Sequence, residues 1–263
     1  MKKRILSILL LCCMVLTLLP TTVLAADGPM NTIPKYDVSI DVYNRTSDIS
    51  IKDSRSYYIY SSVPDKLRDT WAWDKKIFIK GDKAAPHVFI DGVNIEMSPS
   101  SKGPAIELNK KASAYIYFIG KNSSLQGADG RAAIQKNRSE GQLYVLARTG
   151  TTVTCKGGDK AAGIGGSYAT RNISNGYYNG DMYGHGVNMH FGSRSNPDYW
   201  GGTIAAIGGQ GGAGIGGGQG GSGEKLYFYS GTVKAKGGCL ASGSGGDYEE
   251  RGSVIDHYGG TVS

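Results

Sequence analysis

Short runs of alternating apolar and polar residues follow one another along most of the chain, and this period of two is typical of β-strands. The run at 115–119, Tyr-Ile-Tyr-Phe-Ile, shows the pattern clearly. Turn signals such as Asp91-Gly92 and Lys102-Gly103-Pro104 separate the runs. The residues at 64–75 lack the alternation and are expected to form a loop or a short helix. The pattern predicts strands at 38–42, 49–51, 57–60, 77–79, 88–90, 93–97, 105–108, 115–119, 143–146 and 226–229.

In the second half of the chain, the alternation belongs to a repeat. The segment Gly-Thr-Ile at 202–204 returns as Gly-Thr-Val at 231–233 and again at 260–262, with spacings of 29 residues. An earlier copy at 152–158 lies 51 residues before the 203–209 segment, which implies an insertion of 22 residues, placed at about 170–200. Copies that keep one period predict structural units stacked on one another.

Each copy continues into a glycine-rich bend. Glycine suits such bends because it adopts positive φ and lets stacked backbones approach closely. The bends are at 163–166, 214–217 and 243–246. Strands of three to five residues joined by glycine bends predict an all-β fold, a right-handed parallel β-solenoid over 76–263, with an N-terminal cap or first coils at 26–75. Ile204, Val233 and Val262 are then expected to lie one above another.

The N-terminal segment 1–25 has the layout of a secretory signal peptide. Basic residues at 2–4 precede an apolar run at 5–19, and a small-x-small cleavage pattern follows at 23–25. The apolar run is shorter than the ~20 residues of a membrane span, and no later stretch resembles one. We therefore expect a secreted or cell-surface protein whose mature chain has no membrane span.

Composition and charge narrow the choice of partners. The 263 residues include 41 Gly and 17 Tyr but only 5 Phe, which disfavours helix and suggests aromatic rings with hydroxyls near water. The formal charge of +7 falls to +4 when the three basic residues of the signal peptide are removed. Because Lys and Arg are not clustered, nucleic acid is not an expected partner. An acidic polysaccharide or an acidic cell wall is a candidate partner.

Four segments carry a resemblance to a known family. They are Gly-Gly-Thr-Ile at 201–204, Gly-Ala-Gly-Ile-Gly-Gly-Gly at 212–218, Val-Phe-Ile-Asp-Gly-Val-Asn-Ile at 88–95 and Ala-Ala-Ile at 132–134. Together they resemble the secreted, glycine-rich β-solenoid proteins of Gram-positive anaerobes that are described as carbohydrate-binding domain-containing. The resemblance covers 76–263 and implies an extracellular, polysaccharide-binding role and a fold related to parallel β-helix polysaccharide lyases. It assigns no individual binding residue.

Two glycine motifs do not predict cofactor sites. The segment 212–217 fits G-x-G-x-x-G, but more glycine follows where a dinucleotide site needs a helix, so a solenoid bend is the better interpretation. The segment 220–225 lacks the Asp of calcium-binding glycine repeats. No cofactor is expected, although scattered acids could hold a surface Ca²⁺ or simply be solvated. These acids are Asp91, Glu96, Glu107 and Asp129.

The histidines and the repeat strands show no catalytic pattern. His185 and His190 lie five residues apart, which does not match the i, i+4 spacing of a zinc helix, and the four histidines are interpreted as loop residues without a metal. No paired carboxylates and no nucleophile–base pair stand out. The sequence therefore assigns no catalytic residue and favours a protein that is not an enzyme.

Tyrosines dominate the candidate binding residues. In runs such as Leu143-Tyr144-Val145 the apolar residues face one side and the tyrosines the other. The outward set is Tyr115, Tyr117, Tyr144, Tyr227 and Tyr229. Stacked outward rings could support sugar rings, or could pack across strands and stiffen the sheet. A second set lies in the insertion, where the loop could bind a ligand or fold back on the solenoid. It comprises Tyr177, Tyr178, Tyr183, Tyr199 and Trp200.

The two cysteines that remain after processing are not expected to pair. Cys155 aligns with Ala206 and Ala235, an inward site, whereas Cys239 belongs to a different repeat position. Two repeats separate them, about 9.6 Å at the spacing of β-strands, which exceeds the reach of a disulfide.

Three functions remain open from the sequence. The first is an adhesin-like protein that binds a polysaccharide or glycan without catalysis. The second is a structural spacer on the cell surface. The third is a polysaccharide lyase similar to pectate lyases.

Overall fold

The computed structural model describes residues 33–101, 103–109, 111–136, 140–168, 173–174, 177–178, 184–246 and 255–263. The chain divides into two compact units, Met1–Pro34 and Lys35–Ser263, and the second contains all the strands described here. The signal peptide expected at 1–25 lies outside the described residues. Within them the regular secondary structure consists of β-strands apart from two short 3-10 helices, η1 (Asp65–Leu67) and η2 (Pro99–Ser101).

Three parallel sheets make up the second unit, together with a small antiparallel pair. Sheet A contains β1 (Val38–Asp41), β3 (Ser56–Tyr60), β5 (His87–Asp91), β8 (Ala114–Phe118), β11 (Leu143–Ala147), β16 (Gly186–Phe191), β19 (Gly223–Phe228) and β22 (Ile255–His257). Sheet B contains β2 (Ile49–Ile51), β4 (Ile77–Ile79), β7 (Ile106–Leu108), β10 (Ile134–Lys136), β13 (Ile164–Gly165), β18 (Ile215–Gly216) and β21 (Ser244–Gly245). Sheet C contains β6 (Asn94–Glu96), β9 (Ser123–Gln126), β12 (Thr152–Lys156), β17 (Thr203–Ile207), β20 (Thr232–Lys236) and β23 (Thr261–Val262). The antiparallel pair is β14 (Ile173–Ser174) with β15 (Tyr177–Tyr178).

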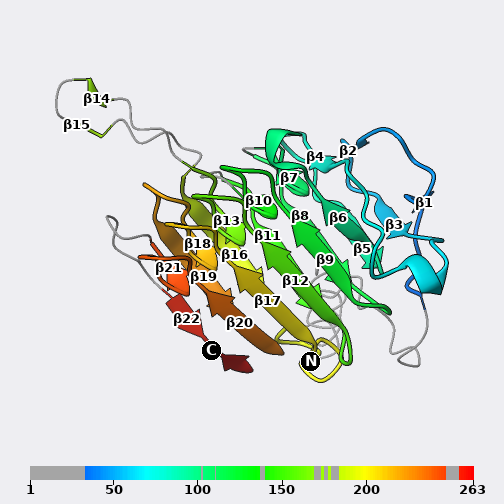
Figure 1. Ribbon diagram of the computed structural model, residues 1–263. Coiled ribbons are helices and arrows are strands. Elements are labelled where there is room, and N and C mark those ends of the chain that lie inside the picture. The colour runs from blue at the N-terminus through cyan, green and yellow to red at the C-terminus, as the bar shows by residue number, and fades with distance from the viewer. Residues whose placement is uncertain are drawn as a thin grey trace, which may run out of the picture. The chain divides into compact units, whose positions relative to one another are not determined.

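From β4 onward, each coil of the chain adds one strand to sheet B, then one to sheet A, then one to sheet C, whereas β3 is followed directly by β4 without a strand in sheet C. Figure 1 shows the result, with the strands of successive coils lying side by side from β3 and β5 to β20 and β22. This arrangement is consistent with a parallel β-solenoid. The strands predicted from the alternation all coincide with or overlap observed strands.

The stacking expected for the repeat is confirmed. Ile204 is the register partner of Val233, and Val233 is the register partner of Val262, on adjacent strands of sheet C. A second column in sheet B consists of isoleucines with 0% exposure, each worth about 1.5–3 kcal/mol of hydrophobic burial. Its members are Ile77, Ile106, Ile134, Ile164 and Ile215. The repeat therefore stacks equivalent apolar side chains along one core.

Glycine is required where sheet B turns toward sheet A. Gly165, Gly216 and Gly245 are register partners with φ of +132°, +132° and +113°. A Cβ on Gly216 would lie 2.0 Å from the carbonyl oxygen of Gly245. Both the backbone angle and the close approach of neighbouring coils exclude a side chain here.

The insertion is divided between two sites, which corrects the single insertion expected at about 170–200. The connection from β13 to β16 is much longer than the equivalent connection from β18 to β19 in the next coil, so part of the insertion lies here. The rest lies between β16 and β17, because this connection is much longer than the equivalent one from β19 to β20. The two insertions therefore flank β16. Sequence spacing between the repeats measured only their total.

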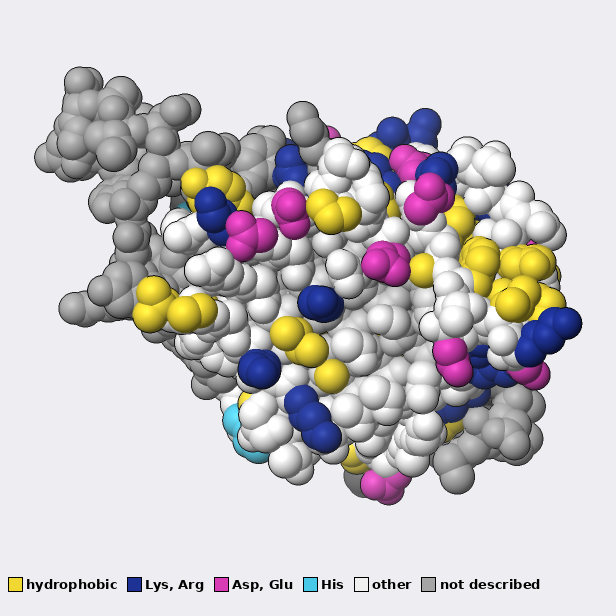
Figure 2. All heavy atoms as spheres, in the orientation of Figure 1, with side chains coloured by type: hydrophobic (Ala, Val, Ile, Leu, Met, Phe, Trp, Pro, Cys, Tyr) yellow, Lys and Arg dark blue, Asp and Glu magenta, His cyan; other side chains and the backbone are white. Residues whose placement is uncertain are grey.

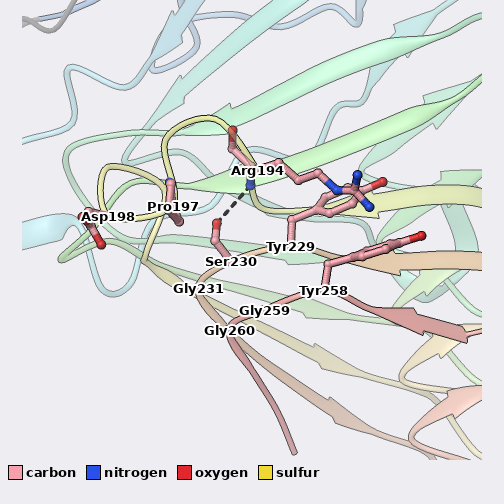
Figure 3. A pocket seen from close by; sticks show the side chains of 10 residues that line it. Arg194, Pro197, Asp198, Tyr229, Ser230, Gly231, Tyr258, Gly259 and Gly260 are labelled. Carbon is pink, nitrogen blue, oxygen red and sulfur yellow. Dashed lines mark hydrogen bonds between the residues drawn. The ribbon is translucent and has the colours of Figure 1, made fainter.

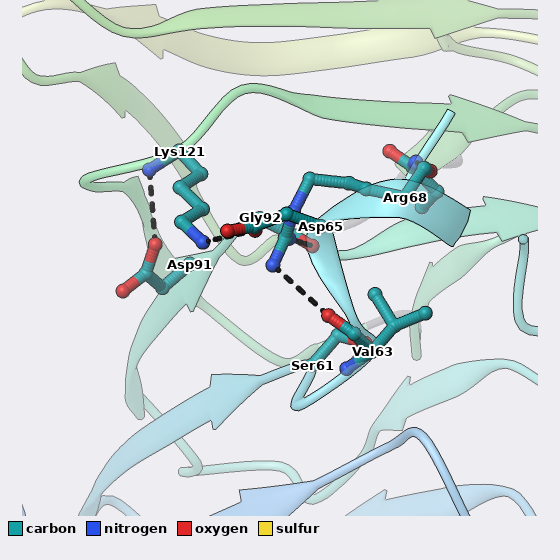
Figure 4. Close-up of polar contacts among 8 residues, drawn as sticks. Ser61, Val63, Asp65, Arg68, Asp91, Gly92 and Lys121 are labelled. Carbon is teal, nitrogen blue, oxygen red and sulfur yellow. Dashed lines mark hydrogen bonds and ion pairs between the residues drawn. The ribbon is translucent and has the colours of Figure 1, made fainter.

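The segment at 64–75 forms η1 and a loop that cover one edge of the first coils. Arg68 donates hydrogen bonds to the carbonyl oxygens of Gly92 and Val63, at 3.0 and 3.4 Å. The Lys121 ammonium lies 2.8 Å from the Asp65 carboxylate, as Figure 4 shows. These contacts fix η1 against the turn after β5.

The cysteines follow the expectation from the repeat. Cys155 on β12 is buried and in register with Ala206, which in turn pairs with Ala235. Cys239 is exposed and follows β20. Both thiols are free, and β17 lies between the two strands.

In the part of the chain that the structure describes, no helix has the length and apolar character that crossing a membrane requires.

Candidate functional site

Five aromatic rings form a column across the outer face of sheet A. They are His87, Tyr115, Tyr144, His190 and Tyr227, which are successive register partners. Successive ring centroids are 4.7, 4.4, 4.3 and 4.6 Å apart, and the planes lie within 15° of parallel. We call these five residues the ring column.

The ring column distinguishes between the two roles considered for the outward tyrosines, which were support of sugar rings and packing across strands. Tyr115 stacks on His87 and on Tyr144, and Tyr144 stacks on Tyr115 and on His190. Both faces of these two rings are therefore covered by neighbours, and a sugar ring has no free face to rest on. The geometry favours cross-strand packing that stiffens sheet A.

Histidines are part of this packing. The sequence-based interpretation of the histidines as loop residues is wrong for His257, which is the last residue of β22. It is also wrong for His87 and His190, which belong to β5 and β16. Their Nδ1 atoms lie 2.9 Å from the hydroxyls of Tyr117 and Tyr229, respectively. Burial lowers the pKa of His87 and lowers that of His190 to about 4. Both rings are consequently neutral at neutral pH.

The end of the second insertion folds back on sheet A. Trp200 is only 5% exposed and packs in an outer apolar cluster with Phe89 and Leu146. Its ring centroid lies 5.0 Å from that of Tyr117 and 4.8 Å from that of Tyr199. Of the two interpretations of this loop, the fold-back holds for Trp200. The side chains of Tyr177 and Tyr178, on β15, and all of Tyr183 lie outside the described residues.

An open groove of about 780 Å³ lies beside the same insertion. It is formed by the loop between β16 and β17, the end of β19 and the residues that follow β22 (Figure 3). The lining residues are Ser193, Arg194, Pro197, Asp198, Tyr229, Ser230, Gly231, Tyr258, Gly259 and Gly260. Three glycines leave part of its wall as bare backbone. The groove thus offers backbone groups, one cation, one carboxylate and two aromatic rings.

Arg194 and the two tyrosines of the groove contact one another. The Arg194 guanidinium carbon lies 3.8 Å from the ring centroid of Tyr258 and 5.0 Å from that of Tyr229. The two rings stack with centroids 5.4 Å apart and planes 19° apart. These three distances form an acute angle at Tyr258, so Arg194 and Tyr229 lie on the same side of its ring (Figure 3). Neither covers the opposite face of Tyr258, which is 53% exposed.

Hydrogen bonds hold the loop that carries Arg194. The Ser193 amide donates to the Ser230 hydroxyl at 2.9 Å, and this hydroxyl donates to the Trp200 carbonyl at 3.0 Å. Gly192 has a φ of +77°, and a Cβ there would lie 2.4 Å from the Ser230 carbonyl oxygen. Both ends of the loop, at Ser193 and Trp200, are therefore anchored to Ser230.

Of the candidate binding residues from the sequence, Tyr229 lines the groove, whereas Tyr115, Tyr144 and Tyr227 belong to the ring column. Sequence reasoning missed Arg194, Asp198 and Tyr258. The repeat contains a signal for Tyr258, because an aromatic residue stands three residues before the Thr of the last three copies: Trp200, Tyr229 and Tyr258 are 29 residues apart. Arg194 and Asp198 have no counterpart in another coil and give no such signal.

The four acids considered for Ca²⁺ lie apart. Asp91, Glu96 and Glu107 belong to sheets A, C and B, respectively. The Asp91 carboxylate accepts hydrogen bonds from Tyr58 and the Lys121 amide, and Glu107 pairs with Lys76 at 2.7 Å. Among the described residues, no group of three or more His, Cys, Asp or Glu side chains is placed to hold a metal ion.

Charged side chains are scattered over the face shown in Figure 2, where Lys and Arg form separate spots instead of a continuous basic stripe. No protein-family model, curated protein or solved structure matches this chain.

Proposed function

We propose that this protein binds polysaccharide in the groove beside Tyr258, without catalysing a reaction, as an exported protein of the cell surface. The observation that carries the proposal is the Tyr258 ring, 53% exposed at the edge of an open groove and supported from one side by Tyr229 and Arg194. The signal-peptide pattern at 1–25 supports export. We further propose right-handed coils, because parallel crossover connections are right-handed in about 98% of cases.

The chemistry of the groove suits sugars. A sugar ring has an apolar C–H face that packs on an aromatic ring, and hydroxyls that need hydrogen-bond partners at its rim. Tyr258 offers the ring, and Asp198, Ser193 and the bare backbone of Gly259 and Gly260 offer acceptors and donors. The groove is open to solvent, which suits a polymer chain better than a small enclosed ligand.

Binding without catalysis is supported by the residues of the groove. Asp198 is the one carboxylate among the described lining residues. Glycoside hydrolysis generally uses two carboxyl groups that flank the bond to be cleaved. The described lining residues therefore include the parts of a binding site but not the pair of carboxylates that hydrolysis needs.

The test is a binding measurement on a panel of polysaccharides, by glycan array and then by calorimetry. We expect at least one polysaccharide to bind, and Tyr258→Ala to weaken that binding about tenfold or more. Tyr36→Ala is the matched control, because Tyr36 is also an exposed tyrosine (41%) but stacks only on Tyr58, outside the groove. Equal loss in both variants, or no binding at all, would contradict the proposal. Release of unsaturated sugars would favour the lyase.

A structural spacer is the second candidate, and the ring column favours it. Five rings in continuous contact link five coils of sheet A and resist bending between them. A protein that binds no polysaccharide but unfolds as one highly stable unit is the outcome expected for a spacer.

A further inference from the structure

We propose that the ligand of the groove is a polysaccharide containing uronic acids, and that Arg194 binds the carboxylate of the sugar. This inference rests on the proposed function and deepens it, because it names the class of sugar. It is carried by the contacts of Arg194, by the polar groups that share its groove and by the form of the groove.

Arg194 is positioned but its donors are not used. The aromatic rings of Tyr229 and Tyr258 contact the guanidinium at 5.0 and 3.8 Å. Contacts of this kind involve the face of the guanidinium and leave its five N–H donors at the edge. Among the described residues Arg194 makes no hydrogen bond and no ion pair, in contrast to Arg55 and Arg68. A fixed fork of free donors matches the two oxygens of a carboxylate.

The carboxylate of the groove itself does not neutralise Arg194. Asp198 is exposed and forms none of the ion pairs found among the described residues. Figure 3 shows Asp198 at the other end of the lining residues from the Arg194 guanidinium. An acidic sugar would therefore place its carboxylate at Arg194 and neutral hydroxyls near Asp198, where a carboxylate accepts hydrogen bonds from them.

The groove fits an acidic sugar better than a free phosphate. A phosphate ion would use the guanidinium alone and leave the exposed ring of Tyr258 without a partner. A polymer of hexuronates has carboxylates as well as apolar ring faces, so one sugar can pack on the free face of Tyr258 while the carboxylate of a neighbouring sugar binds Arg194. The volume of about 780 Å³ lies within the range of ligand sites and exceeds what one small ion needs.

The experiment compares a polygalacturonate oligosaccharide with its methyl ester, which keeps the rings and hydroxyls but removes the charge. Calorimetry at constant ionic strength should show the charged form binding about tenfold more tightly, the effect of one charge-assisted contact. Arg194→Gln should abolish this preference, and Arg194→Lys should restore part of it. Lys156→Gln removes an equal charge from an exposed position on sheet C and serves as the control, with the preference unchanged.

The outcomes separate this inference from the proposed function. Equal binding of acid and ester, with loss of both in Tyr258→Ala, would overturn the role of Arg194 and keep the polysaccharide site. A preference that survives in Arg194→Gln would assign it to the net charge of the protein, which also overturns the inference. If inorganic phosphate competed for the groove as well as the uronate does, the ligand would be assigned as a phosphate and the inference would be overturned. If neither oligosaccharide bound, and no other polysaccharide of the panel bound, the proposed function itself would be contradicted.

Discussion

The rings of Tyr144 and His190 stack with centroids 4.3 Å apart, although four other strands lie between β11 and β16 in the sequence. His190 continues through its Nδ1 to the hydroxyl of Tyr229, 2.9 Å away, and Tyr229 stacks on Tyr258 in the groove. The ring column and the candidate binding site are thus joined through one histidine. The protonation state of His190 therefore affects both the ring column and the groove.

The first prediction concerns pH. Burial lowers the pKa of His190 from 6.5 to about 4. As the pH falls, His190 is therefore protonated in the unfolded chain before it is protonated in the folded protein. Its contribution to stability is then present in full above pH 6.5 and is lost as the pH falls toward 4, by about 3 kcal/mol at most. The lowered pKa of His87 acts in the same direction.

Urea unfolding at pH 7 and at pH 4.5 measures this effect. His190→Phe keeps an aromatic ring in the column, and we expect it to lose less stability between the two pH values than the natural protein. His257→Phe, which alters an exposed histidine outside the column, is the comparison variant for the loss of one imidazole. Identical pH dependence in His190→Phe and the natural protein would contradict the prediction.

Glycine stacking gives the second prediction. Gly216→Ala would place a Cβ 2.0 Å from the Gly245 carbonyl oxygen and force a side chain into φ +132°, so we expect a loss of more than about 3 kcal/mol. Gly150→Ala is the control, because Gly150 also has a positive φ, +83°, but a Cβ there meets nothing within 4 Å. It should cost about 1 kcal/mol. Thermal unfolding of both variants checks the difference, which disappears if steric contact between coils is unimportant.

The third prediction is energetic coupling within the ring column. Tyr115 and Tyr144 stack at 4.4 Å, and a double-mutant cycle with leucine at both positions should give a coupling of about 1 kcal/mol. Tyr36 and Tyr144 do not contact each other, and the same cycle on this pair should give less than about 0.5 kcal/mol. Additive effects at positions 115 and 144 would show that the stacking contributes nothing beyond burial.

Thiol reactivity gives the fourth prediction. Burial in an apolar core raises the pKa of Cys155, and its side chain is 0% exposed, whereas Cys239 is exposed. Iodoacetamide should therefore modify Cys239 in the folded protein and Cys155 only after unfolding. Peptide mapping by mass spectrometry distinguishes the two sites. Modification of Cys155 at the same rate as Cys239 under native conditions would place it outside the core.

The fold was within reach of the sequence because equivalent positions recur at constant spacing. Ile204, Val233 and Val262 are 29 residues apart and occupy one column, so the spacing of the repeat is sufficient to predict the register. The inward position of Cys155 followed from the same alignment. Where coils share one sequence pattern, an alignment of the repeats predicts which residues are register partners on adjacent strands.

The groove could not be predicted from the repeat in the same way. Arg194 and Asp198 belong to an insertion that occurs in one coil, and their places depend on the turn at Gly192 and on hydrogen bonds to Ser230. The total spacing could not show that the extra residues are divided between two sites. The histidines of the ring column were misinterpreted because a polar residue between strands and one stacked within a strand look alike in sequence.

Apart from the coil that carries the two insertions, the coils have nearly the same length, which also bears on how this protein can change in evolution. Ile215 and Ser244 stand on equivalent positions 29 residues apart. A tandem duplication of a gene segment of this size would add one rung, about 4.8 Å of length, and the new rung would pair with both of its neighbours. Deletion of one residue inside a rung would instead turn its oily side chains outward. Evolution can therefore add coils or insert residues in the bends far more easily than it can change the length of a strand within a coil.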